Sequence, residues 1–103
     1  MKDENSNSPE IDVEISAEIA LGTYSNLAII SHSTSEFVLD FVRMMPGMSK
    51  SQVQSRIILT PEHTKRLMLM LQENIARYES MLGKIELHLP ESPTIRTFGG
   101  RES

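Results

Sequence analysis

The sequence has no cysteine and no tryptophan, and only five of its 103 residues are aromatic. The absence of cysteine excludes disulfides, thiolate metal sites and cysteine nucleophiles. With so few aromatic rings, the core must depend on aliphatic side chains and on the seven methionines. No apolar run reaches the length of a membrane span, and the polar first ten residues predict neither a signal peptide nor an anchor. We therefore expect a single-domain cytoplasmic protein whose modest core is supplemented by a subunit interface.

Basic residues are also in deficit, and the two signs of charge are unevenly distributed. The formal net charge is −4, but residues 1–40 carry eight acids and one base, whereas residues 41–103 carry six acids and nine bases. A general nucleic-acid binder would more often be basic overall. The opposite charges of the two parts favour contact between them, either within one subunit or between subunits.

Apolar and polar residues alternate from residue 11 to residue 21, with every odd position apolar and acids at most even positions before residue 20. Strict alternation predicts a β-strand with one dry face. Further strands are predicted over residues 24–32, 36–44 and 53–59, and the short links between them favour an antiparallel meander. Both faces of the strand over residues 24–32 are partly apolar, which favours a central position in the sheet or cover by a second subunit.

A helix is predicted from residue 61 to residue 82. Thr60 can cap its first amides, Pro61 suits the first helical position, and Gly83 suits the end. Apolar residues recur at steps of three and four and define a face for the sheet, at Leu67, Leu71, Ile75, Tyr78 and Leu82. Further apolar residues on the helix widen this face, which suggests that the helix also contacts a second surface.

The predicted fold class is therefore α+β: a four-stranded antiparallel β-meander followed by one long amphipathic helix packed on the sheet. Residues 1–10 are expected to be a disordered tail, residues 11–83 the single domain, and residues 84–103 a short extended segment and flexible tail. Alternation over residues 85–89 leaves a short fifth strand open.

No catalytic, cofactor or metal site is predicted. The three histidines lack the spacing of a helical ligand pair. Ser31 and His32 point to opposite faces of a strand and cannot readily form part of a triad with Asp40. Asp40, which falls between two valines on its strand face, is expected to pair with Arg43, Arg56 or Lys65, or to be solvated near an edge.

Several longer stretches resemble an uncharacterised prokaryotic family of unknown function. Residues 24–33 read YSNLAIISHS, residues 36–41 EFVLDF, residues 56–67 RIILTPEHTKRL, and residues 71–79 LQENIARYE. The resemblance covers about residues 13–80 and implies a small domain without assigning an activity. The family pattern is matched at Tyr24, Asn26, His32, Asp40, Pro61 and Tyr78.

The expected function is that of a non-enzymatic, homo-oligomeric protein-interaction module, a homodimer or larger. A meander followed by a helix is similar to the fold of the export chaperone SecB, which suggests a holder of peptides or unfolded clients. Single-stranded nucleic-acid binding is the alternative, although one candidate stacking residue and scattered bases give it less support. The predicted interaction surface combines adaptable methionines with neighbouring apolar and basic residues, at Met44, Met45, Met48, Lys65, Arg66, Met68, Leu69 and Met70.

Overall fold

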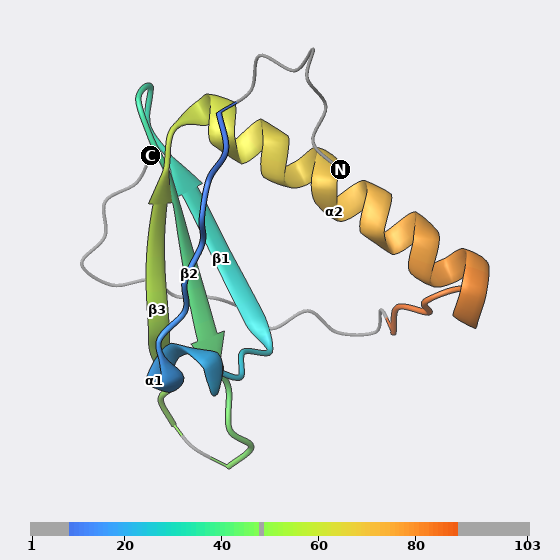
Figure 1. Cartoon of the computed structure of the whole chain (residues 1–103). Helices are drawn as coiled ribbons and strands as arrows, with labels where there is room; N and C mark the ends of the chain where they lie inside the picture. The colour runs from blue at the N-terminus through green and yellow to red at the C-terminus, as the bar shows by residue number, and fades with distance from the viewer. Residues whose placement is uncertain (1–8, 48, 89–103) are drawn as a thin grey trace.

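The computed structural model describes residues 9–47 and 49–88, which form an antiparallel sheet and a long helix. The sheet consists of β1 (Leu27–His32), β2 (Phe37–Arg43) and β3 (Gln52–Leu59), in the order β1-β2-β3 (Figure 1). The predicted α+β class and antiparallel meander are confirmed. The predicted fourth strand is wrong, because the sheet in the described part of the chain has three strands.

The segment predicted as the first strand, residues 11–21, has a different structure. It runs without a strand partner into a single helical turn, α1 (Ala17–Ala20). The Ser16 hydroxyl caps this turn by accepting a hydrogen bond from the Ile19 N–H at 3.2 Å. The chain then turns at Gly22, which has a φ of 81°. Alternation determines which side chains share a face, but a strand also needs a hydrogen-bonding neighbour, and this segment has no strand partner among the described residues.

The helix α2 (Pro61–Leu82) has the predicted bounds. The Thr60 hydroxyl accepts a hydrogen bond from the His63 N–H at 3.2 Å, which satisfies one amide of the first turn. At the other end Gly83 has a φ of 103°, in the region that favours glycine. Two ion pairs between residues four apart form on the exposed surface of the helix, one between Glu62 and Arg66 and the other, at 3.6 Å, between Glu73 and Arg77.

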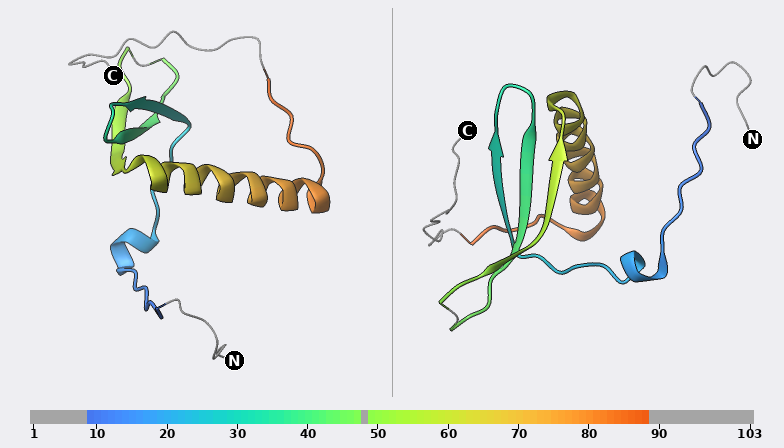
Figure 2. Two further views of the ribbon diagram at one scale, coloured as in Figure 1. Left: turned by 90° about the horizontal axis from the view of Figure 1, so that it is seen from above. Right: turned by 90° about the vertical axis from the view of Figure 1, so that its left-hand side faces the viewer.

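Only the first part of α2 lies against the sheet. Its early turns face β3 and β2, and the rest continues past the sheet (Figure 2). A helix of 22 residues is about 33 Å long, whereas the outer strands of a three-stranded sheet lie about 10 Å apart. The expected packing on the sheet is therefore restricted to the beginning of the apolar stripe. Leu67 is half-buried, and the later stripe residues are exposed, at Leu71, Ile75, Tyr78 and Leu82.

The core of the single chain is small and is centred on β2. Among the described apolar residues, only Leu39 and Val42 are buried, with 6% and 4% of their surface exposed. β1, which the sequence suggested for a central position, lies at an edge and leaves Ile30 exposed. The central position that the sequence favoured for this strand is therefore wrong, and cover by a second subunit stays a prediction.

The segment that follows α2 is not a strand. Residues 85–88 have no ladder partner, and Leu89 lies outside the described residues. The Ile85 N–H donates to a carboxylate oxygen of Glu79 at 2.9 Å, and the Gly83 N–H donates to the Glu79 carbonyl at 3.1 Å. Glu79 therefore holds the first residues that follow the helix.

Candidate functional site: an apolar groove beside α2

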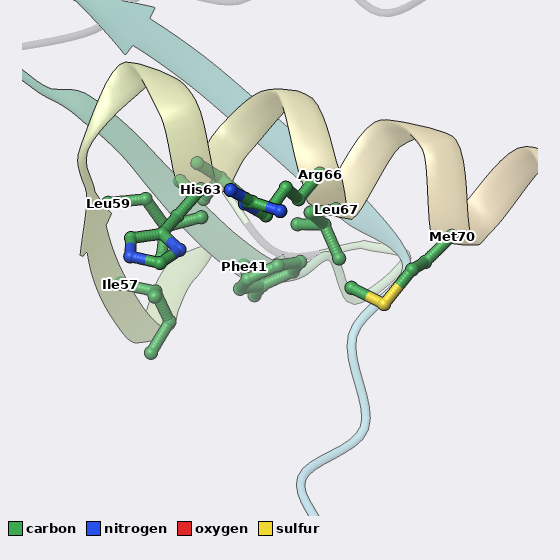
Figure 3. Close-up of a pocket in the computed structure, with 8 residues that line it drawn as sticks. Phe41, Ile57, Leu59, His63, Arg66, Leu67 and Met70 are labelled. Atoms are coloured by element: carbon green, nitrogen blue, oxygen red, sulfur yellow. The ribbon is translucent and has the colours of Figure 1, made fainter. Parts of the chain in front are cut away.

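A groove of about 440 Å³ lies between the sheet and the first half of α2 (Figure 3). The sheet contributes its floor and the helix one wall. Its lining is almost entirely apolar, from Leu39, Phe41, Ile57, Leu59, His63, Arg66, Leu67 and Met70. Such a lining is suited to receive apolar side chains.

The groove follows from two periodicities in the sequence. Leu39 and Phe41 are two residues apart on β2, and register places them opposite Ile57 and Ser55 of β3, so these side chains share one sheet face. On the helix, His63, Leu67 and Met70 are separated by steps of four and three and therefore lie along one side. The turn at Thr60 brings the helical side over the sheet face.

Polar groups occur at the helical wall of the groove. Arg66 is hydrogen-bonded to Glu62 one turn earlier, and this hydrogen bond is the main reason that the pKa of Glu62 lies below its usual value. None of the groove-lining residues is a carboxylic acid. The groove thus combines an apolar floor with two basic side chains, His63 and Arg66, on its helical wall.

The opposite sheet face carries a charged pair. Arg56 lies directly across from Asp40 and donates twice to its carboxylate, from Nε to Oδ1 at 2.7 Å and from a terminal nitrogen to Oδ2 at 2.9 Å. The hydrogen bond from Arg56 lowers the pKa of Asp40, against an opposing effect of burial. Of the partners expected for Asp40, the structure selects Arg56 because register places it opposite.

The predicted interaction surface is divided by the structure into two separate parts. Met44 and Met45 follow β2 at the end of the sheet away from the start of α2, where Asn26 holds the Met44 backbone through hydrogen bonds of 2.7 and 3.1 Å. Met48 lies outside the described residues. On α2, Arg66 and Met70 line the groove, whereas the other three predicted residues are exposed beside it: Lys65, Met68 and Leu69.

Several groove residues were not among the predicted site residues, namely Leu39, Phe41, Ile57, Leu59, His63 and Leu67. The sequence carried a signal for most of them, because the alternating strand positions and the helical stripe marked them as core. What it did not indicate is that their common surface would remain open. His63 had no such signal, since its place depends on the direction of the helix.

The histidines are not gathered into a metal site. His32 stacks on Phe37 with a ring-centroid distance of 5.2 Å, and His63 lines the groove. Over residues 9–47 and 49–88, no group of three His, Asp or Glu side chains is placed to hold a metal ion. The same part of the chain contains no helix with the length and apolar character of a membrane span.

Comparison with protein families identifies the family of this domain. A family model described as "Protein of unknown function (DUF3467)" matches residues 1–87. The chain belongs to the DUF3467 family. Membership confirms the resemblance to an uncharacterised domain family, and the match covers the sheet, the groove and α2. Neither the curated proteins nor the solved structures give a match, so the geometry must carry the functional argument for this DUF3467 member.

Proposed function

We propose that this protein is a non-enzymatic, homo-oligomeric interaction module that holds apolar peptide segments, including those of unfolded clients, in the groove beside α2. The observation that carries the proposal is the continuity between the groove and the apolar stripe of the helix. Leu67 lines the groove, and Leu71, Ile75, Tyr78 and Leu82 extend its apolar side beyond the sheet. A contiguous exposed apolar surface of this kind is typical of a protein interaction site.

The two ends of this surface suit different partners. Beside the sheet, the groove is concave and has Arg66 at its helical wall, which suits an apolar segment with acidic flanks. Beyond the sheet, Ile75 and Tyr78 lie on a convex helix side that a second helix can pack against. We therefore assign the binding of extended segments to the groove and helix-to-helix self-association to the later part of the stripe.

Single-stranded nucleic-acid binding has weaker support. Phe41 lies under α2, whereas exposed Tyr24 precedes β1 and Lys65 lies on the helix, so stacking and cationic groups are not arranged along one sheet face. Binders of single strands generally combine aromatic platforms with a cationic track along the backbone.

The test compares two methionines of the same helix. Met70 lines the groove and Met68 does not, and the two side chains are similarly exposed. We expect Met70→Gln to weaken binding of a fluorescent, unstructured apolar peptide by about three- to tenfold, since it puts an amide against an apolar lining. Met68→Gln should leave the affinity unchanged.

Suppression of aggregation of a chemically denatured client should follow the same order. Equal effects of Met70→Gln and Met68→Gln, or no peptide binding at all, would contradict the groove as the site. A labelled single-stranded oligonucleotide should be measured in parallel at low and moderate salt. Tight binding with a steep salt dependence would instead favour the nucleic-acid function.

A further inference from the structure

We propose that residues 11–16, here called the arm, add as a strand to the free edge of β3 in a second copy of this chain and place their apolar face in its groove. The proposal names a partner for the groove and rests on the homo-oligomer proposed above. It is carried by three features: an unpaired strand edge, an alternating segment without a strand partner, and the match of their faces and charges.

The free edge belongs to β3. Among the strands that the structure describes, β3 pairs only with β2, so its other side is open to a further strand (Figure 1). The helix leaves β3 at Thr60 and crosses towards the other strands, so it does not lie along this edge. An exposed edge offers backbone donors and acceptors that an extended segment can pair with.

The arm has the pattern of a strand but lacks its environment. Ile11, Val13 and Ile15 share one face, yet 74%, 86% and 63% of their surfaces are exposed. In Figure 1 the arm passes in front of the sheet, but Figure 2 shows that it stands well apart from it. The burial of this apolar face therefore requires another surface.

The faces of the arm match the faces of β3. Ile57 and Leu59 point into the groove, and Arg56 points to the other side of the sheet, where it pairs with Asp40. A strand added here with its odd residues on the groove side extends the apolar floor. Its even residues, Asp12 and Glu14, then lie on the side of Arg56, as oppositely charged cross-strand neighbours.

Spacing and charge favour the same edge. On a strand, residues two apart lie about 6.6 Å from each other, and on a helix residues four apart lie about 6 Å from each other. Successive apolar residues of the arm therefore have nearly the same spacing as the residues of the helical wall. The outer strand β1 is also an edge, but Leu27–His32 contains no lysine or arginine to meet an acidic arm. β3 provides Arg56, on the sheet face where the even residues of the arm would lie.

A second copy is favoured over return of the arm to its own sheet. The arm is joined to β1, the strand farthest from β3, and α1 with the turn at Gly22 directs it away from its own sheet (Figure 2). Reciprocal exchange around a two-fold axis buries two arms and two edges at once. Each copy would then have the four-stranded sheet that the alternation predicts, with one strand from its partner.

Single cysteines can test the exchange without background because the chain has none of its own. His63→Cys marks the groove near β3 in one population. A second population, carrying a longer affinity tag, has the cysteine at Ile11, Val13 or Ile15, or at Asp12 or Glu14 as face controls. After the two full-length proteins are mixed and mildly oxidised, we expect a mixed disulfide from at least one odd position, well above both even positions.

The outcomes separate the two proposals. Equal cross-linking from odd and even positions would overturn the arm's orientation. An intramolecular disulfide in a Val13→Cys/His63→Cys double variant, with no mixed disulfide between single variants, would place the arm on its own chain and overturn the exchange.

If light scattering shows a stable oligomer that keeps its affinity in Val13→Asp, the arm proposal fails but the homo-oligomer stands. A strictly monomeric wild-type protein would overturn both.

Substitutions in the arm should also change the dissociation constant of the oligomer. Val13→Asp should raise the dissociation constant of the oligomer by about tenfold or more, because it places a charge in an apolar contact. Glu14→Asp, which puts the same side chain at the neighbouring position and keeps the charge, should change that constant little. A similar loss of association in both variants would contradict the proposed facing of the arm.

Discussion

At the residue scale, Asp40 shows how one position can be polar within an apolar pattern. Its surface is 9% exposed, so its charge needs compensation, which Arg56 supplies through two hydrogen bonds. The pair lies on the sheet face away from the groove. The pair joins β2 to β3 and maintains the register on which the groove depends.

Replacement of Asp40 by asparagine should lower the free energy of unfolding by about 1 kcal/mol at neutral pH, because the charge-assisted hydrogen bonds weaken and Arg56 remains solvated. The pKa of Asp40 is lowered in the folded protein. The stability that this carboxylate contributes is therefore complete above its ordinary pKa and is lost as the pH falls through the lowered, folded-state pKa.

Chemical denaturation of wild type and Asp40→Asn at neutral and acidic pH measures this difference. The gap between the two proteins should narrow only in the acidic range. A gap that stays constant down to the pH of acid unfolding would assign the effect of the substitution to packing rather than to charge.

At the element scale, local signals determine α2 and fail for the arm. Thr60, Pro61 and Gly83 act within a few residues of themselves, so the helix bounds could be predicted from the sequence. The arm needs a strand partner from elsewhere, and alternation alone cannot supply one. The short helix α1 had a weak signal in Ser16, which is a favourable N-cap residue.

Thr60→Ala should lower the free energy of unfolding by about 1 kcal/mol because the first turn of α2 loses a side-chain acceptor. Thr60→Ser keeps the hydroxyl and should retain most of the stability. Thermal unfolding followed by circular dichroism gives the comparison. If the serine variant were as unstable as the alanine variant, the methyl group rather than the cap would be responsible.

At the scale of the whole molecule, a small core coexists with a long exposed apolar stripe. Leu39 and Val42 are the buried apolar residues of the described chain, whereas much of the sheet and helix surface is apolar and open. One subunit of this size gains limited stability from its own core. The proposed self-association would remove this surface from water.

Ile75→Gln should raise the dissociation constant of the proposed oligomer by about tenfold, because Ile75 lies on the part of the stripe that extends beyond the sheet. Ala76→Gln, at the next position and off the stripe, should have little effect. Sedimentation over a range of protein concentrations measures both. Unchanged association of Ile75→Gln would remove this part of α2 from the interface.

The sequence by itself determined the α+β class, three of the strands, the bounds of α2 and a short set of candidate partners for Asp40, because these depend on periodicity and on residues close in the chain. Tertiary structure decided the rest. It placed β1 at an edge, selected Arg56 for Asp40, limited the packing of α2 to its first turns and left the groove open. These outcomes depend on the width of the sheet and the direction of the helix, which arise only when distant segments meet.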